Sequence, residues 1–291
     1  MQKPTTYREA LHRASSLLEQ NQLNPKIAEW LMLHAAQIER REWLEKLNDI
    51  ISVSLLDIYI SWIRRVIEGE PYQYITEVEE FYGREFHVNS AVLIPRPETE
   101  LLVEHVLAYR QEVWPALQQD QQIKGVDVGT GSGVIAISLA LEDPKLEMLA
   151  VDLSESALEV AQKNADRWRA QVQFLPSDLL TSLQQAQEKV DVIVSNPPYI
   201  PYRDKATLAR NVVDFEPHLA LFADQEGLSC YRQIVEQSRD ILRRPGLIAF
   251  EIGQGQDEAV VQLIHSVYPE AICQVKEDYN RIKRMVFAIV R

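Results

Sequence analysis

Four consecutive residues near the middle of the chain combine an amide, a rigid backbone and an aromatic ring: Asn196, Pro197, Pro198 and Tyr199. They directly follow an apolar run at 190–195, which predicts a buried strand. Two prolines donate no ladder hydrogen bonds, so the strand must end there and the chain must leave the sheet extended. In an open α/β sheet, ligands bind in loops at the carboxyl ends of strands. The tetrapeptide therefore predicts either a rigid strand exit or a site for a small planar polar group.

A glycine-rich loop follows another predicted strand, at 123–128, and opens a predicted helix. Its members are Gly129, Thr130, Gly131, Ser132 and Gly133. Glycines at alternate positions let a backbone turn tightly and approach a ligand closely. The spacing is GxGxG, whereas dinucleotide sites use GxGxxG, and Asp127 places an anion beside the loop. That anion disfavours a pyrophosphate and suits a ligand with an ammonium or sulfonium group.

Asp152 ends the next predicted strand, roughly 20 residues further on, where a carboxylate can accept both hydroxyls of a ribose. The loop, this carboxylate and the βαβ context together predict S-adenosylmethionine, with S-adenosylhomocysteine as the product of methyl transfer. Asp178 and Leu179 follow the third strand, where they could bind the adenine amino group and cover the ring. A capped loop explains these two residues equally well.

A methyl donor gives Asn196 to Tyr199 a chemical context. A planar amide or amino nitrogen attacks a sulfonium methyl poorly, because its lone pair is delocalised. Acceptors on its N–H groups would direct the lone pair at the methyl and offset the developing charge. The Asn196 side-chain oxygen and the Pro197 carbonyl are the candidate acceptors, and Tyr199 would pack on the planar group. This is catalysis by positioning and electrostatic complementarity, with no general base needed before attack.

The elements that position these loops divide the chain into three predicted parts. An N-terminal helical domain spans 1–72, a β-hairpin linker spans 73–97, and a methyltransferase domain spans 98–291. In the helical part Thr6 is a plausible cap, and Ser54 begins another strong helical pattern.

Strands and helices alternate after residue 123, which predicts a doubly wound sheet. The predicted strands are 123–128, 146–151, 172–175, 190–195 and 247–252, and the predicted helices include 132–141, 154–168, 228–242 and 257–267. No helix separates the last two strands, 271–276 and 285–290, so they predict a terminal antiparallel pair. The fold class is an α/β, Rossmann-like class I S-adenosylmethionine-dependent methyltransferase sheet, joined to a small N-terminal helical bundle.

Composition narrows the classes of partner. The chain has 291 residues, 46% of them hydrophobic, and a net charge of −13, which is unfavourable for gripping nucleic-acid phosphates. It has neither an apolar signal core nor a run of ~18 apolar residues, and Cys230 and Cys273 form no Cys/His cluster. We expect a cytoplasmic monomer without a metal, and without direct contact to nucleic acid or membrane.

Over nearly its whole length the chain resembles the PrmC/HemK protein-(glutamine-N5) methyltransferases. The motifs that carry the resemblance lie at 71–75, 94–100, 129–133, 195–200, 215–217, 227–228, 231–232 and 251–253. Asn-Pro-Pro-Tyr alone is shared with amino-methyltransferases of DNA adenine. The segment Pro95-Arg96-Pro97-Glu98-Thr99-Glu100 is much more specific to the glutamine enzymes.

The resemblance implies a substrate and a set of binding residues. The cofactor would bind at Gly129 to Gly133, Asp152 and Leu179; the substrate glutamine would bind at Asn196, Pro197, Pro198 and Tyr199, with Pro95, Arg96 and Glu98 lining the same cleft. In the family that glutamine belongs to the Gly-Gly-Gln loop of class I peptide chain release factors, and the helical domain helps hold this partner. This chain departs from the family at Leu179, where an aromatic is frequent, and at 278–284, which lacks glycine.

Two other substrates stay open at this point. One is a ribosomal-protein glutamine, whose methyltransferase would differ mainly in its N-terminal half. The other, less favoured, is the N6 amino group of DNA adenine, which the acidic charge and the lack of a separate basic recognition domain oppose.

Overall fold

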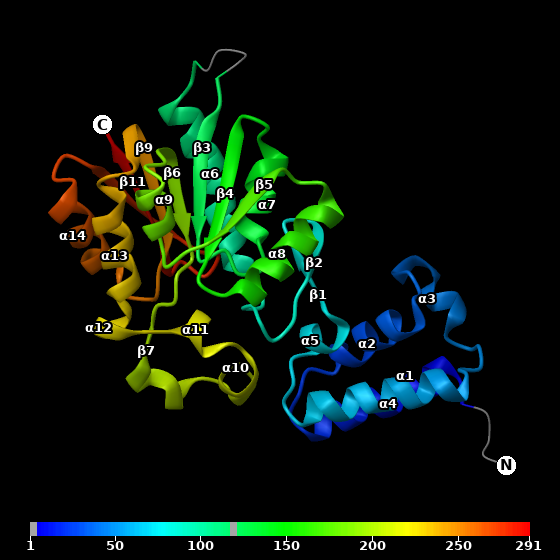
Figure 1. Cartoon of the computed structure of the whole chain (residues 1–291). Coiled ribbons are helices and arrows are strands. Elements are labelled where there is room, and N and C mark those ends of the chain that lie inside the picture. The colour runs from blue at the N-terminus through cyan, green and yellow to red at the C-terminus, as the bar shows by residue number, and fades with distance from the viewer. Residues whose placement is uncertain (1–4, 117–120) are drawn as a thin grey trace. The chain divides into compact units, whose positions relative to one another are not determined.

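Figure 1 shows the computed structural model of the chain, which describes residues 5–116 and 121–291. The chain divides into two compact units. The first contains the residues up to Val78 together with 210–215, and the second contains 79–209 and 216–291. Each unit is built around an apolar core of its own.

The first unit is helical. Its helices are α1 (Tyr7–Gln20), α2 (Lys26–Ala36), α3 (Arg40–Lys46), α4 (Val53–Ile67), α5 (Tyr72–Thr76) and α10 (Arg210–Phe215). Thr6 caps α1 as predicted, because its hydroxyl accepts from the Glu9 amide and the Glu9 carboxylate accepts from the Thr6 amide. The helix predicted from Ser54 begins one residue earlier, at Val53, and Ser52 caps it, because the Ser52 hydroxyl accepts from the Leu55 amide.

The second unit contains the predicted sheet, which has seven strands in the order β10-β11-β9-β6-β3-β4-β5. Their bounds are β3 (Ile123–Val128), β4 (Leu146–Asp152), β5 (Val172–Pro176), β6 (Val190–Ser195), β9 (Leu242–Glu251), β10 (Ile272–Glu277) and β11 (Lys283–Val290). All pairs are parallel except those of β11, which runs antiparallel to both β9 and β10. The predicted fold class, with its reversed strand near the end, is confirmed.

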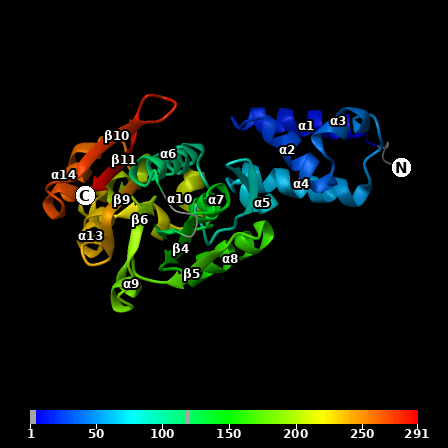
Figure 2. The ribbon, with the colours of Figure 1, turned by 90° about the horizontal axis from the view of Figure 1, so that it is seen from above.

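Helices cover both faces of this sheet (Figure 1). One face carries α6 (Pro97–Val113), α7 (Val134–Glu142) and α8 (Glu155–Trp168), and the other carries α9 (Thr181–Gln185), α13 (Ser229–Ser238) and α14 (Asp257–Val267). Figure 2 shows α6 and α13 on opposite sides of β9. A sheet covered on both faces needs strands that are apolar at nearly every position. In β11, Met285 and Phe287 enter one core, and Val286 and Ala288 enter the other.

The predicted helix at 228–242 is wrong at its carboxyl end, because α13 stops at Ser238. The carbonyl of Ile241 accepts from the Val190 amide at 2.9 Å, and Leu242 pairs with Val190. The chain is therefore already aligned with β6 before Pro245, which lies inside strand β9.

Two further segments belong to the second unit, except for Val78 and α10, which are grouped with the first. The hairpin β1 (Val78–Phe81) and β2 (Arg84–His87) lies within the predicted linker, and its Phe81 and Phe86 belong to the core beneath α6. The segment between β6 and α13 contains β7 (Ile200–Pro201), the 3₁₀ helix η1 (Tyr202–Thr207), α10, α11 (His218–Leu221), β8 (Phe222–Ala223) and α12 (Asp224–Gly227). Strands β7 and β8 pair in parallel and bring the two ends of this segment together.

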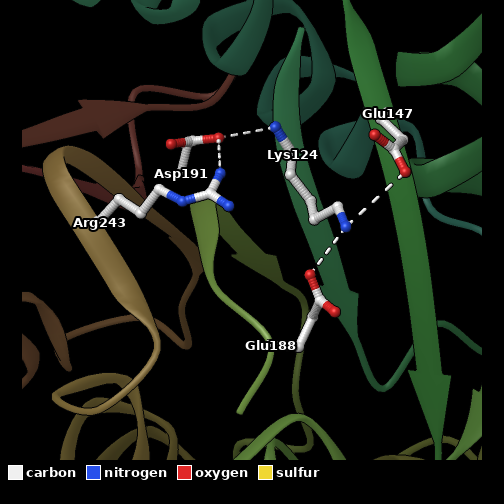
Figure 3. A network of polar contacts seen from close by, with 5 residues as sticks. All are labelled: Lys124, Glu147, Glu188, Asp191 and Arg243. Atoms are coloured by element: carbon white, nitrogen blue, oxygen red, sulfur yellow. Dashed lines mark hydrogen bonds and ion pairs between the residues drawn. The ribbon is translucent and has the colours of Figure 1, made fainter. Parts of the chain in front are cut away.

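Charged residues tie the amino ends of four strands together (Figure 3). The Lys124 ammonium lies 2.8 Å from Glu188 and 3.8 Å from Glu147. Asp191 accepts from the Lys124 backbone amide at 2.8 Å and from Arg243 at 3.0 Å. These contacts hold the start of β3 against β4, β6 and β9, at the edge opposite the strand ends where ligands bind.

Two absences hold for the residues that the structure describes. None of their helices is long and apolar enough to cross a membrane. No group of three or more of their His, Cys, Asp or Glu side chains is placed to hold a metal ion.

Candidate active site

The sheet places the two predicted loops side by side. Strands β3 and β6 are parallel neighbours, with Val128 opposite Ser195, so both strands end at the same edge. The Ser195 hydroxyl donates to the Val128 carbonyl at 2.6 Å and ties the two strand ends together. The glycine loop and the Asn-Pro-Pro-Tyr loop therefore begin next to each other.

A cavity of about 280 Å³ lies between these loops, within the second unit. Of the predicted site residues, it is lined by Pro95, Arg96, Gly129, Thr130, Gly131, Ser132, Asp152, Asp178, Leu179, Asn196 and Pro198. The other five predicted residues do not line it: Glu98, Asp127, Gly133, Pro197 and Tyr199. Lining residues that the sequence reasoning missed include Thr99, Leu153, Ser154, Cys230 and Gln233. One cavity thus reaches both predicted ends, the cofactor end and the acceptor end.

The glycine loop is shaped for a ligand. Gly129 and Gly131 have φ of +70° and +57°, a conformation that strains other residues, and a Cβ on either would meet no atom within 4 Å. The Asp152 carboxylate accepts from the Gly131 and Ser154 amides, both at 2.9 Å. It also faces the cavity, where its remaining lone pairs can accept ribose hydroxyls.

Asp127 lies beneath this loop and is fully buried. Its Oδ2 accepts from the Thr130 hydroxyl at 2.6 Å and from the Ala136 amide at 3.2 Å. Among the described residues, none donates to Oδ1. Burial raises the pKa of Asp127 to about 7. A buried carboxylate with one unpaired oxygen, next to an open glycine loop, fits a ligand that carries a cationic tail.

The far end of the cofactor half of the cavity is lined by apolar and polar side chains together. Leu153 is 57% exposed, and Leu179 has φ of +50°. Asp178 lies beside Leu179 in the same wall. These residues match what an adenine ring needs, an apolar cover and an acceptor for its amino group. Leu153 was detectable from sequence only through its position, directly after Asp152.

At the acceptor end, interior residues fix the orientation of the Asn196 side-chain amide by hydrogen bonds. Its Nδ2 donates to the Thr99 hydroxyl at 3.2 Å, and that hydroxyl donates to the Glu251 carboxylate at 2.6 Å. Thr99 lies in the first turn of α6, and Glu251 ends β9. The bonded N–H leaves Oδ1 as the acceptor that Asn196 offers.

Tyr199 packs against the core on the helix α13 side of the sheet, and burial raises its pKa. Its backbone carbonyl accepts from the Gln256 side-chain Nε2 at 3.1 Å. A Cβ on Gly227 would lie 2.0 Å from that carbonyl oxygen, so the close approach requires glycine. Pro197 is buried in the same turn. Neither residue lines the cavity, so their substrate contacts remain predictions.

The Pro95 to Glu98 segment is anchored by a buried carboxylate. Glu216 accepts from the Arg96 guanidinium at 2.5 Å and from the Ile94 amide at 3.3 Å, and it is 3% exposed. Arg96 thus lines the cavity while its guanidinium forms an ion pair with the buried Glu216. Glu98 is half-buried and lies outside the lining.

Solved methyltransferase structures share this fold. A methyltransferase from Pyrococcus furiosus superposes with a TM-score of 0.51 at 14% identity, covering 78% of this chain and 96% of that chain. The hMettl16 catalytic domain, solved with an RNA hairpin, gives 0.56 at 15% identity, covering 76% and 80%. The methyltransferase small domain family matches residues 101–215. Fold and cavity together define a class I methyltransferase, whose methyl donor is S-adenosylmethionine.

Sequence relatives narrow the class to one family. Residues 9–76 match the PrmC N-terminal domain family. Release factor glutamine methyltransferase from Bacillus cereus is 39% identical over 96% of this chain and 98% of its own length. The proteins of that name from Bacillus subtilis and Staphylococcus aureus are 40% and 38% identical over 97% and 96% of this chain, and over 97% and 98% of their own lengths. The chain belongs to the release factor glutamine methyltransferase family, as the sequence motifs predicted.

Proposed function

We propose that this protein transfers a methyl group from S-adenosylmethionine to the side-chain amide nitrogen, N5, of the glutamine in the Gly-Gly-Gln loop of class I peptide chain release factors. The observation that carries the proposal is the single cavity lined by both the glycine loop and Asn196. The family to which the chain belongs supports the choice of substrate.

The acceptor end supplies what a poor nucleophile needs. When bound, S-adenosylmethionine provides an electrophilic methyl carbon attached to a sulfonium. Asn196 Oδ1 and the Pro197 carbonyl accept from the two N–H bonds of the substrate amide, which aims the nitrogen lone pair at that carbon. These acceptors also stabilise the positive charge that develops on nitrogen. Transfer would form a carbon–nitrogen bond to the substrate amide and break the methyl–sulfur bond of the donor, and the methylated amide would then lose a proton to water.

The remaining predicted residues complete this arrangement. Asp152 holds the ribose, Asp178 and Leu179 hold the adenine, and Asp127 favours the cationic tail from beneath the loop. Tyr199 restricts rotation of the substrate amide, while Pro95, Arg96 and Pro198 line the same cavity. The helical first unit, up to Val78, binds the release factor outside the cavity.

Asn196→Ala tests the central role. Because the substitution removes an acceptor without touching the glycine loop, we expect kcat to fall by about 100-fold while the cofactor Kd stays within twofold. Single-turnover transfer from labelled cofactor to a purified release factor gives the rate, and calorimetry gives the Kd. Loss of cofactor affinity with an unchanged rate would contradict the role. Label on a release factor whose Gly-Gly-Gln glutamine is replaced would instead favour a different acceptor, such as a ribosomal-protein glutamine.

A further inference from the structure

A hydrogen-bond relay runs from the acceptor loop to a buried carboxylate. Asn196 donates to Thr99, and Thr99 donates to Glu251. The three residues come from the end of β6, the start of α6 and the end of β9, so the relay joins three elements. Thr99 and Glu251 are each 3% exposed, while Asn196 and Thr99 also line the cavity, so the relay connects the cavity wall to the interior.

The charge of Glu251 decides the direction of this relay. An ionised carboxylate only accepts, so the Thr99 hydroxyl must donate to it. The hydroxyl lone pairs and the carboxylate itself are then the interior partners of Asn196, and both can be satisfied only by its N–H group. A protonated Glu251 can donate to Thr99, and the hydroxyl can then turn toward Asn196 and allow the nearly symmetric amide to flip.

We propose that Thr99 and Glu251 are positioning residues that keep the Asn196 amide with its N–H group in the interior and its Oδ1 toward the substrate. This inference rests on the proposed function, because a substrate amide presents two N–H donors at this position. A flipped Asn196 would oppose them with its own donors. By keeping Oδ1 toward the substrate, the relay favours planar groups that present N–H donors and raises their rate of methylation.

Several groups surround Glu251 and set the pH at which the relay operates. After burial, the hydrogen bond from Thr99 lowers its pKa, Glu98 on α6 raises it, and Arg284 on β11 and a direct hydrogen bond from Asn196 lower it. The Tyr231 hydroxyl on α13 donates to its backbone carbonyl at 2.8 Å. The pKa of Tyr199 is raised first by burial and next by the charge of Glu251. Burial is the largest influence and raises the pKa of Glu251 to about 7. The carboxylate form, and with it the ordered relay, therefore dominates above neutral pH.

Thr99→Val tests the relay with a side chain of nearly the same shape. The valine can neither accept from Asn196 nor donate to Glu251. We expect kcat for release-factor methylation at pH 8 to fall by about 10- to 100-fold, with the KM for the release factor and the cofactor Kd within twofold. Thr99→Ser keeps the hydroxyl and should stay within threefold of the wild-type kcat. Thr99→Val at the wild-type rate would overturn the proposal.

Glu251→Gln tests the role of charge, because glutamine can both accept and donate. At saturating cofactor, the wild-type kcat should fall as pH is lowered through 7, and the variant should be slower at pH 8 and flat from pH 6 to 8. Thermal unfolding adds a second readout. In the folded protein the pKa of Glu251 is about 7, above the ordinary 4.5, so the free energy of unfolding of the wild type falls as pH rises from 4.5 through 7. Glu251→Gln lacks this loss, so its stability relative to the wild type should increase over the same range.

The outcomes separate this proposal from the proposed function. A wild-type protein that transfers no methyl group to the release factor would overturn both. An active wild type whose acid limb persists unchanged in Glu251→Gln would overturn the relay alone. A folded Thr99→Ser variant as slow as Thr99→Val would also overturn it, because the hydroxyl would then not be the group that matters.

Discussion

Asp152 and Asp127 sit near the same glycine loop in different surroundings. Asp152 faces the cavity, and each of its oxygens is paired with a backbone amide. Asp127 lies below the loop, fully buried, with one oxygen unpaired among the described residues. Because Asp152 lines the cavity, it can bind ribose hydroxyls directly. Asp127 suits a longer-range role, as the negative charge that favours a cationic ligand above it.

Asp127→Asn should therefore weaken cofactor binding without removing the loop. We expect the Kd to rise about tenfold at pH 8, because the charge is lost while the shape is kept. In the wild type, protonation below the raised pKa of about 7 should weaken binding as pH falls, and the variant should show no such dependence. Calorimetric titration of the cofactor from pH 6 to 8.5 measures both effects.

A matched control is Asp191→Asn, a buried aspartate at the opposite edge of the sheet, which should leave the Kd unchanged. Equal affinity of the Asp127→Asn variant and the wild type at pH 8 would show that the charge has no part in binding.

At the residue scale, the sequence predicted the residues at strand ends and missed the contacts made through space. Gly129, Asp152 and Asn196 were found because each ends an apolar run, and all three line the cavity. The bond between Thr99 and Glu251 connects positions 152 residues apart. No local pattern indicates that pairing, since it depends on α6 packing beside the end of β9.

At the element scale, strand positions were predictable because a sheet covered on both faces needs continuous apolar runs. Helix ends were less predictable than strand positions, since α4 is capped by Ser52 and begins at Val53, not at the predicted Ser54. Helix α3 was missed because it is short and buries only Trp43, which is too little to produce a periodic pattern. The end of α13 was misplaced because the pairing of Leu242 with Val190 is a tertiary contact.

The charged contacts at the amino ends of the strands offer a test of stability that is independent of the site (Figure 3). Asp191 is 8% exposed and accepts from two donors, Arg243 and the Lys124 backbone. Asp191→Ala leaves the part-buried Lys124 backbone amide without its partner, so we expect the free energy of unfolding to fall by about 1–3 kcal/mol. Urea denaturation measures this change.

Glu147→Ala is the matched control in the same network. Its ion pair with Lys124 is 3.8 Å long and its side chain is 51% exposed, so solvent screens it. The free energy of unfolding should change by less than about 0.5 kcal/mol. An equal loss in the two variants would contradict a structural role for Asp191 in this network. Cofactor affinity should be unchanged in both, since they lie at the edge away from the cavity.

At the scale of the whole molecule, the division of labour follows the two units. Every residue that lines the cavity belongs to the second unit, while the first has a core and a family match of its own. The predicted boundaries at 72 and 97 came from a change of periodicity. The structure groups the residues up to Val78, together with Arg210–Phe215, as one unit. No sequence pattern placed 210–215 there, because that grouping depends on packing between distant segments.

Removing residues 1–78 should separate cofactor binding from substrate recognition. We expect the cofactor Kd to stay within about threefold, because the cavity is built without these residues. The kcat/KM for a whole release factor should fall by roughly 100-fold, about 2.7 kcal/mol of binding. A truncated protein that is folded by thermal unfolding and methylates the release factor as efficiently as the full chain would refute a recognition role for the first unit.

The most direct test of the central claim locates the transferred methyl group. The full-length protein is incubated with S-adenosylmethionine and an unmethylated class I release factor, and the product is fragmented in a mass spectrometer. We predict one methyl group on the side-chain nitrogen of the Gly-Gly-Gln glutamine, formed about 100-fold more slowly when Asn196→Ala replaces the wild type. A methyl group at any other residue, or none at all with a protein that binds the cofactor, would contradict the proposed function.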